Sequence, residues 1–523
     1  MTNGRDGDHL SWGDALFLYL ERAGMPLNIA CVSIFDGPIS LNACIRSLEA
    51  KLTLLPRYYQ RIVTPPLDIG FPSWEYDSDF DIHNHVREVI LKRGTERELK
   101  VVTGKIFSTV MDRQRPLWDL VLVQGLRGNR TALVTRVHHC LADGIAGVGL
   151  MSTLLDPTPE PQPVPKKRRS RPTPRPQSQW TMLLDGWIAS SSDLVQRMLS
   201  AQADVLHFSQ QLLSSGDWPL SEFSRFLPEL TAPTERLFFN KTYQGPQKFA
   251  WAQIPLSTLK SIRHKCGTTL NDVILALMTA TIQRYSESHG ERVKGRLFRM
   301  MVPVSFRPTD RKDELGNWIS LLPVTVPLGI RSPRKLLAAV HERVDFLKRA
   351  HIAELVGLIG GMVGAAPAPL QALVGPVASL LPVTPFNLVC TNVRGPETPL
   401  YLLGRKMVDW YPYVPVGGEM ALNCAILTYN DIAYFGFSGD VQAAPDLESL
   451  ESLLLASVDA LQSDAGLKRT RKRKPRSRRT STSSPPKRVA AAPARLARMN
   501  PHPVVSRQDG TDEHASPAPV AAD

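Results

Sequence analysis

The 523-residue sequence lacks several motifs that would assign it to a common class of enzyme. It has no Gly-x-Ser-x-Gly turn of the kind that carries a lipase nucleophile, no Walker phosphate loop and no convincing Gly-x-Gly-x-x-Gly. Side chains that bind metals do not cluster at the spacings of known metal sites. We therefore exclude these lipase and P-loop classes, and we expect the protein to need no bound cofactor.

Cysteine is scarce and scattered. The six cysteines, at positions 31, 44, 140, 266, 390 and 424, form no Cys-x-x-Cys pair. Such a distribution predicts reduced thiols in a cytoplasmic protein. The first nine residues are polar and contain no apolar core of a signal peptide. We therefore expect neither a disulfide framework nor secretion.

Long continuous apolar runs are also missing. Residues 355–393 carry no charge, but five prolines interrupt them, and the longest proline-free run before Phe386 has twelve residues. A membrane-spanning helix needs about 20 consecutive apolar residues, so the segment predicts no transmembrane helix. Buried core helices are the simpler interpretation of this segment. The alternative is a surface of short apolar helices that enters a lipid interface and admits an apolar substrate.

The net charge of +13 belongs to two appendages. Residues 156–179 are rich in proline and carry six basic against two acidic residues, which predicts an exposed linker. Residues 467–523 carry fourteen basic against four acidic residues, which predicts a disordered tail. The remaining body is near neutral. The basic run at 468–479 suits anionic lipid headgroups, nonspecific contact with nucleic acid, or a solvated tail without a partner.

The stretch that organises the chain is TALVTRVHHCLADGIAGVGLMSTLL, residues 131–155. Its β-branched first part predicts a buried strand over 131–137, and its apolar last part predicts a buried helix over 145–155. Neighbouring side chains on a strand point to opposite faces, so His138 and His139 cannot both face one cavity. Asp143 can cap the helix or pair with an arginine, and Gly144 permits the sharp bend between them.

Spacing alone leaves the role of this elbow open. A histidine is more often a satisfied polar residue than a catalytic base, and two adjacent histidines on a strand diverge too much for a metal site. Cys140 next to His139 suggests a thiol nucleophile, but sequence neighbours on a strand do not meet. General-base catalysis by an imidazole is the functional alternative.

Other stretches resemble a known family. HHCLADG fits the His-His-x-x-x-Asp-Gly signature of CoA-dependent acyltransferases and of peptide-synthetase condensation domains. The sequence further resembles the bacterial wax ester synthase/diacylglycerol acyltransferase family in LSWGDALFLYLERAGMPLNIACVSIF (10–35), RPLWDL (115–120), TLNDVILA (269–276), MVPVSFR (301–307), GNWIS (316–320) and TNVRGP (391–396). The resemblance covers residues 9–462, while Arg394 and the basic tail depart from the family pattern.

The resemblance implies an α/β fold of two chloramphenicol-acetyltransferase-like domains with an active-site tunnel between them. We expect the N-terminal domain at residues 1–155 and the C-terminal domain at 242–465. The proline-rich linker would occupy 156–180, a bridging helical segment 181–241, and the disordered basic tail 466–523.

The implied activity is transfer of a fatty acyl group from acyl-CoA to diacylglycerol, to a long-chain alcohol, or to both. His139 is the expected general base, because it alone has the His-x-x-x-Asp spacing to Asp143. His138 and Asp143 would hold the elbow. The resemblance also implies substrate-binding roles at the remaining positions of the two motifs, namely Gly144, Asn271 and Asp272, although an N-cap is the simplest interpretation of Asn271-Asp272. Acyl-CoA is then a substrate, and peripheral contact with an anionic membrane or a lipid droplet is expected.

Two rival functions follow from the same residues. A condensation domain shares the His-His motif, but no carrier or adenylation region accompanies it here. A catalytically inert protein that binds lipid surfaces or nucleic acid through its tail is the rival from another class. Deletion of residues 467–523 would abolish that binding function and leave an acyltransferase largely active in detergent.

Overall fold

The computed structural model describes residues 9–22, 24–65, 71–162, 202, 234–305, 319–373 and 386–467. Three predicted segments lie largely outside these ranges. They are residues 163–180 of the linker, residues 181–201 and 203–233 of the bridging segment, and residues 468–523 of the basic tail. The described residues belong to one compact unit, Met1–Thr470.

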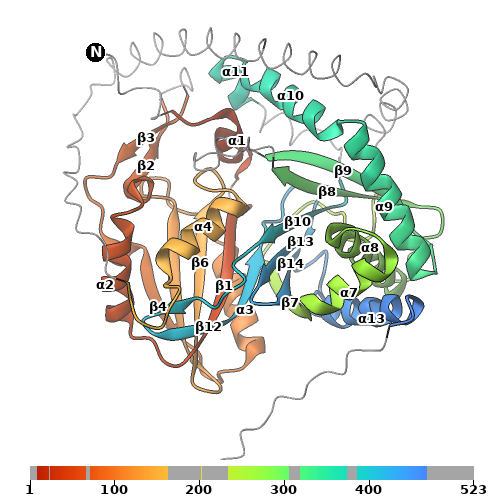
Figure 1. The fold of residues 1–523 in the computed structure, drawn as a ribbon. Helices are drawn as coiled ribbons and strands as arrows, with labels where there is room; N and C mark the ends of the chain where they lie inside the picture. Colours follow the sequence, from red (N-terminus) through yellow and green to blue (C-terminus); the bar gives the residue numbers. More distant parts are fainter. Residues whose placement is uncertain are drawn as a thin grey trace, which may run out of the picture. The chain divides into compact units, whose positions relative to one another are not determined.

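The first sheet is built mainly from the N-terminal half (Figure 1). Two of its inner strands, β5 and β6, are buried along nearly their whole length, and β6 is the buried strand predicted over 131–137. β6 pairs antiparallel with β5 and with β1. In spatial order the strands are β11 (Tyr401–Leu402), β12 (Arg405–Tyr413), β1 (Asn28–Asp36), β6 (Arg130–His138), β5 (Trp118–Leu126) and β4 (Val86–Ile90).

The second sheet comes from the C-terminal half. Its strands, in spatial order, are β7 (Gln247–Pro255), β14 (Ile432–Asp440), β13 (Leu422–Tyr429), β10 (Leu388–Arg394), β8 (Leu297–Ser305) and β9 (Ile319–Pro327). The helices that accompany this sheet are α7 (Leu256–Cys266), α8 (Leu270–Ser288), α9 (Pro333–Arg349) and α13 (Ser449–Asp464). Their buried leucines, isoleucines and valines form one core cluster with the sheet. The predicted α/β class is confirmed.

Strand β12 links the two halves. It lies in the C-terminal half of the sequence, yet it completes the first sheet by pairing antiparallel with β1 (Figure 1). Outside the first sheet, it also contacts β13 and β14 of the second sheet. The approach is so close that a Cβ at Gly436 on β14 would lie 1.7 Å from the carbonyl oxygen of Pro412 on β12, so only glycine fits there. The predicted domains, 1–155 and 242–465, assign each half of the chain to a separate domain. They do not include the placement of β12 in the first sheet.

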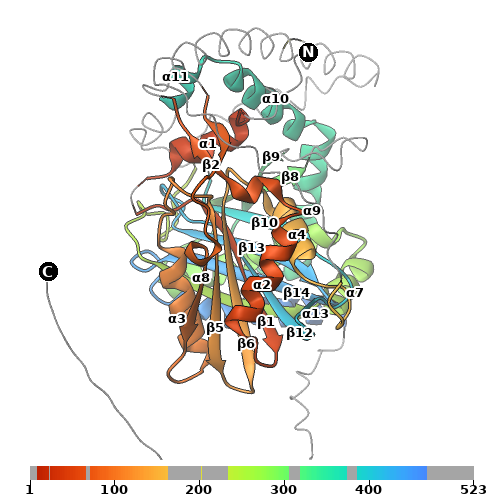
Figure 2. The same cartoon turned by 90° about the vertical axis from the view of Figure 1, so that its left-hand side faces the viewer.

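Helices of the N-terminal half surround the first sheet (Figure 2). These helices are α1 (Trp12–Leu20), α2 (Leu41–Leu52), α3 (Glu96–Phe107) and α4 (Gly144–Leu154). Two short 3₁₀ helices, η1 (Pro56–Tyr59) and η3 (Ile82–Asn84), lie between α2 and α3 in the chain. A separate hairpin pairs β2 (Gln60–Val63) with β3 (Ser73–Tyr76). The helix predicted at 145–155 is α4, which begins and ends one residue earlier.

The charge-free segment does not form buried core helices where the structure describes it. It contributes α10 (Ile352–Gly364) and α11 (Ala368–Ala372) before the chain enters β10. Only Ile352 and Gly364 are buried in α10, whereas Met362 is 60% exposed. The interpretation as buried core helices is therefore wrong for most of residues 355–373, although Val356 still packs against the core of the second sheet. No helix in the described part of the chain is both long and apolar enough to cross a membrane.

Candidate active site

The predicted elbow joins the end of β6 to the start of α4. Asp143 is the N-cap of α4, and its Oδ1 accepts a hydrogen bond of 2.7 Å from the main-chain N–H of Ala146. This bond satisfies one of the free N–H groups of the first helical turn. Capping, one of the two contacts expected for Asp143, is therefore present.

His138 is fully buried and points away from the cavity described below. Its Nδ1 accepts a hydrogen bond of 3.1 Å from the N–H of Cys140, so the proton of the neutral ring sits on Nε2. Nε2 lies 3.3 Å from Oε1 of Glu21, a residue next to the end of α1. The ring therefore has a fixed tautomer and holds the elbow against α1.

Glu21 is the buried centre of this support. Its carboxylate accepts hydrogen bonds of 3.1 Å from the N–H of Leu27 and 3.0 Å from the guanidinium of Arg113. Burial alone would raise the pKa of Glu21, but its contacts with the His138 ring, the N–H of Leu27 and the guanidinium of Arg113 hold it below its ordinary value. Glu21 is thus ionised at neutral pH and fixes both His138 and the start of the following loop.

His139 lies on the other side of the elbow and lines the cavity. Its ring stacks on Phe17 of α1, with centroids 3.7 Å apart and planes 7° from parallel. Its main-chain N–H donates to the carbonyl of Leu27 at 3.0 Å. Burial lowers the pKa of His139 to about 4, and a main-chain hydrogen bond within its own residue opposes this effect only in part. The imidazole is therefore neutral, and able to accept a proton, at neutral pH.

The cavity has a volume of about 230 Å³ and lies where the two sheets meet. Its walls come from β1, β6 and α4 on one side and from β8, β10, β12 and β13 on the other, and most of them are apolar. Two glycines of α4 widen it. A Cβ at Gly144 would lie 3.1 Å from the side chain of Val393, and one at Gly147 would lie 3.3 Å from that of Ile29. The space suits an apolar chain beside an imidazole.

The predicted pair Asn271-Asp272 lies behind this cavity. Neither residue lines it, but Asn392 does, and its Nδ2 donates to Oδ1 of Asn271 at 3.4 Å. Asp272 is fully buried and forms a capping box with Thr269, which is the actual N-cap of α8. Its Oδ2 also lies 2.7 Å from Nδ1 of His341. The structure thus brings Asn271 within one contact of the cavity and places Asp272 at a helix start.

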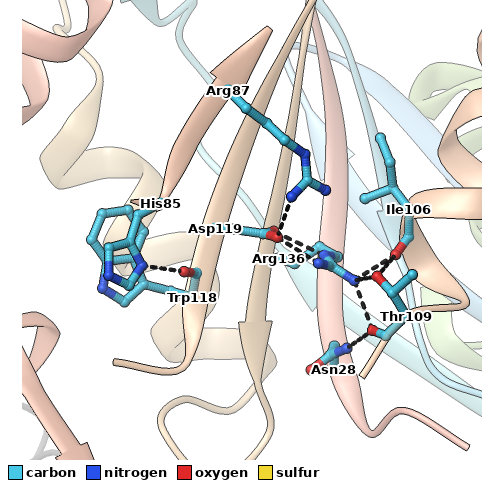
Figure 3. Close-up of polar contacts among 8 residues, drawn as sticks. All are labelled: Asn28, His85, Arg87, Ile106, Thr109, Trp118, Asp119 and Arg136. Atoms are coloured by element: carbon cyan, nitrogen blue, oxygen red, sulfur yellow. Dashed lines mark hydrogen bonds and ion pairs between the residues drawn. The ribbon is translucent and has the colours of Figure 1, made fainter. Parts of the chain in front are cut away.

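A buried ion pair braces the strand that carries the histidines (Figure 3). The guanidinium of Arg136 on β6 binds both carboxylate oxygens of Asp119 on β5, at 2.8 and 2.5 Å. It also donates to the carbonyl and hydroxyl of Thr109 at 2.9 and 2.7 Å, and to the carbonyl of Ile106 at the end of α3. Arg136 stands two residues before His138, so this network fixes the end of β6. Asp119 therefore braces the fold.

Sequence reasoning missed Phe17, Glu21 and Asn392 as residues of this site. All three fall inside stretches that carry the family resemblance, 10–35 and 391–396. No spacing rule connects them to His139, because they are more than a hundred residues away along the chain. Among the described residues, no group of three or more His, Cys, Asp or Glu could hold a metal ion.

This chain is similar to known proteins along most of its length. Residues 10–274 match the wax ester synthase/diacylglycerol acyltransferase catalytic domain, and residues 315–462 match the C-terminal domain of the same family. Probable diacylglycerol O-acyltransferase tgs1 of Mycobacterium tuberculosis is 28% identical over 448 residues, covering 85% of this chain and 93% of the relative. For tgs2 of the same organism the identity is 27% over 462 residues, covering 87% and 98%.

Solved structures share the fold. The wax ester synthase/diacylglycerol acyltransferase from Marinobacter aquaeolei VT8 superposes with a TM-score of 0.60 at 24% identity, over 88% of this chain and 100% of that one. The first condensation domain of the calcium-dependent antibiotic synthetase superposes with a TM-score of 0.55 at 16% identity, over 88% and 98%. These two likenesses speak for the fold, including its expected kinship with condensation domains.

Proposed function

The chain belongs to the wax ester synthase/diacylglycerol acyltransferase family, and from that premise we propose that it esterifies diacylglycerol with the acyl group of acyl-CoA, with His139 as general base. The product is triacylglycerol. Long-chain alcohols, which give wax esters, are the second class of acceptor. Membership of this family makes the protein an acyl-CoA-dependent acyltransferase. The observation that carries the base assignment is a neutral imidazole in the wall of an apolar cavity.

The chemistry needs a base of this kind. An alcohol holds its proton tightly at neutral pH, so attack on a thioester is slow unless a base removes the proton as the bond forms. Imidazole is the usual group for this task. His139 is kept neutral by burial, while the buried, fixed tautomer of His138 leaves that ring unsuited to proton transfer with a substrate. The two histidines of the motif therefore have different roles.

The proposed reaction has two steps and no acyl-enzyme. His139 takes the proton of the acceptor hydroxyl while the oxygen attacks the thioester carbonyl, which gives a tetrahedral intermediate and an imidazolium. The carbon–sulfur bond then breaks, and the imidazolium returns the proton to the leaving CoA thiolate. The site starts the next cycle with a neutral imidazole. The reaction as proposed uses acyl-CoA as a substrate and requires no further cofactor.

Other residues of the motifs act by position. His138 and Asp143 hold the elbow through Glu21 and through the first turn of α4. Gly144 keeps the cavity open in front of Val393. Asn392, supported by Asn271, is the only amide side chain among the described residues that line the cavity and is our candidate donor for the developing oxyanion. Asp272 serves the start of α8 and is no substrate ligand in this proposal.

The names of the relatives favour diacylglycerol as acceptor. The two mycobacterial relatives are described as diacylglycerol O-acyltransferases. Both family models belong to lipid acyltransferases, which weighs against a condensation domain despite the shared fold. We further propose that the protein works at the surface of a membrane or lipid droplet, because both proposed acceptors partition into lipid.

The test is release of CoA from palmitoyl-CoA by the purified full chain, with diacylglycerol and hexadecanol offered separately. His139→Ala should lower turnover with either acceptor by about 10²-fold or more, the usual worth of a general base. His83→Ala, a histidine whose side chain is 69% exposed on the surface, is the matched control and should leave turnover unchanged. Equal, negligible release by wild type and His139→Ala would refute the enzymatic proposal.

A further inference from the structure

The outer face of α10 and α11 concentrates exposed apolar side chains. Eleven large apolar residues of the described chain are prominently exposed, and five of them lie within the 15 residues from 359 to 373. Exposed fractions in this set run from 39 to 60%; its members are Ile359, Met362, Val363, Leu370 and Leu373. A single exposed apolar residue is ordinary, whereas a contiguous set marks a contact surface.

Polar groups on this segment are turned inward. The other exposed residues between 357 and 373 are glycines and prolines, and no polar side chain is among them. The one polar side chain there, Gln371, is fully buried. Its Nε2 donates to the carbonyls of Gly364 and Ala366 at 2.7 and 2.8 Å. The outer surface of this segment is therefore apolar, as in a segment that contacts lipid rather than water.

Several main-chain groups around the turn between the two helices have hydrogen-bond partners within the segment itself. The carbonyls of Gly361, Met362 and Val363 accept from the N–H groups of Ala365 and Ala366 at 3.0 to 3.2 Å. Pro367 accepts from the N–H of Gln371 at 3.1 Å. Carbonyls at the end of a surface helix are usually satisfied by water. Internal partners are what a turn needs when it enters hydrocarbon, where an unsatisfied group costs several kcal/mol.

This surface is connected to the active site through α1. Gly364 packs so closely on Trp12 of α1 that a Cβ there would lie 2.9 Å from the Cβ of Trp12. One and a half turns further along α1, Phe17 covers the ring of His139. The short helix α1 therefore contacts α10 through Trp12 and covers His139 through Phe17.

Basic residues stand at one end of the surface. The last turn of α9 carries Lys348 and Arg349, both exposed, directly before α10 begins. Cations beside an apolar face suit a lipid surface, where headgroup phosphates lie next to acyl chains. The chain also continues from 374 to 387 without a charged residue.

We propose that the outer face of α10 and α11 inserts into a lipid surface and places α1 at the point where the lipid acceptor leaves that surface for the cavity. The proposal rests on the proposed function, since it assigns the route of the lipid acceptor. It makes the apolar face, rather than the basic tail, the main source of lipid binding. The occupant of the face is therefore a layer of lipid.

The experiment measures flotation of the full chain with vesicles of phosphatidylcholine and phosphatidylglycerol that contain dioleoylglycerol. Binding is measured at 1 M NaCl, where the Debye length of about 3 Å screens attraction by the tail. Met362→Glu/Leu370→Glu changes side chains that are 60 and 57% exposed, and Ile90→Glu/Val101→Glu changes two that are 70 and 53% exposed elsewhere. The matched pairs alter charge and apolarity equally, so they differ only in place.

The α10–α11 pair should weaken vesicle binding at least about tenfold, because two apolar anchors become charges at the interface. It should lower turnover of vesicle-borne diacylglycerol to a similar extent and leave turnover of dissolved 1-hexanol unchanged. The Ile90/Val101 pair should match wild type in every assay. Absence of turnover with both vesicle-borne diacylglycerol and 1-hexanol in all three proteins would refute the proposed function while leaving vesicle binding as a separate result.

Unchanged flotation of the α10–α11 pair would overturn the proposal. If its melting temperature fell at the same time, another segment of this chain would be the cover of the face. If wild type were a dimer that this pair converted to a monomer, the cover would be a second copy of the chain. Loss of wild-type flotation at 1 M NaCl would assign binding to the charged appendages instead.

Discussion

Removal of the ring of Phe17 should move the acid limb of the pH–rate profile upward. Phe17 stacks on His139 with centroids 3.7 Å apart, and burial lowers the pKa of His139 to about 4. The reaction needs the neutral imidazole, so activity of the wild type is lost as pH falls through about 4. In Phe17→Ala, water reaches one face of the ring and stabilises the imidazolium. The pKa then rises, and activity is lost at a higher pH.

The size of the change follows from the burial of the ring. The pKa of His139 stands at about 4 against an ordinary 6.5. Each pKa unit is worth about 1.4 kcal/mol, so burial disfavours the imidazolium by roughly 3 kcal/mol. Phe17 covers one of the two faces of the ring. We therefore expect its removal to recover somewhat less than half of the difference, which places the acid limb near pH 5, about one unit above wild type.

The assay is kcat/KM for CoA release between pH 3.5 and 8, with 1-hexanol as a dissolved acceptor so that lipid binding does not enter. Phe80→Ala is the matched control, because Phe80 stacks on a different histidine, His85, with centroids 5.2 Å apart. It should leave the limb in place. A wild-type limb near 6.5, or a limb that Phe17→Ala does not move, would show that a dehydrated His139 is not the base.

Three further predictions test the cavity, the brace and the helix cap. Gly147→Leu should fill the cavity next to Ile29 and shift the ratio of kcat/KM for palmitoyl-CoA over octanoyl-CoA about tenfold toward the shorter chain; competition between the two substrates measures it, and an unchanged ratio would place the acyl chain elsewhere. Arg136→Met should lower the free energy of unfolding by about 3 kcal/mol, since it leaves Asp119 with only its 3.5 Å contact to the more exposed Arg87. Urea unfolding measures this loss, and the double variant with Asp119→Leu should recover most of it. Asp272→Ala should cost about 1 kcal/mol of stability through the capping box of α8. Its kcat should stay within about twofold of wild type, because substrate does not contact the side chain; a larger fall in kcat at unchanged KM would return Asp272 to the catalytic machinery.

Most of the local structure around the elbow could be predicted from the sequence. The β-branched apolar run corresponds to β6. The polar turn ends at Asp143, the N-cap, and the apolar run with glycines that follows it corresponds to α4. These are short-range effects of side-chain shape and hydrogen bonding, so adjacent residues are sufficient to specify them. The opposite directions of His138 and His139 follow in the same way from the alternation of a strand.

The support of the site depends on contacts between distant residues. Glu21 faces His138, and Phe17 covers His139, only because α1 packs beside the end of β6. Nothing in the spacing of residues 12–21 signals these partners. Asn392 reaches the cavity in the same manner from β10. The low pKa of His139 also comes from this packing, because burial by remote segments is its largest cause.

The sequence by itself determined the strand–elbow–helix unit, the absence of charge from 355 to 393 and the confinement of positive charge to two appendages. The tertiary structure alone decided that β12 crosses into the first sheet, that Asp119 and Arg136 form one buried brace, and that α10 faces outward. A pattern of apolar residues fixes where a helix or strand forms and which of its faces is apolar. Whether that face meets protein or solvent depends on which other segments reach it, and that is a property of the whole packed chain.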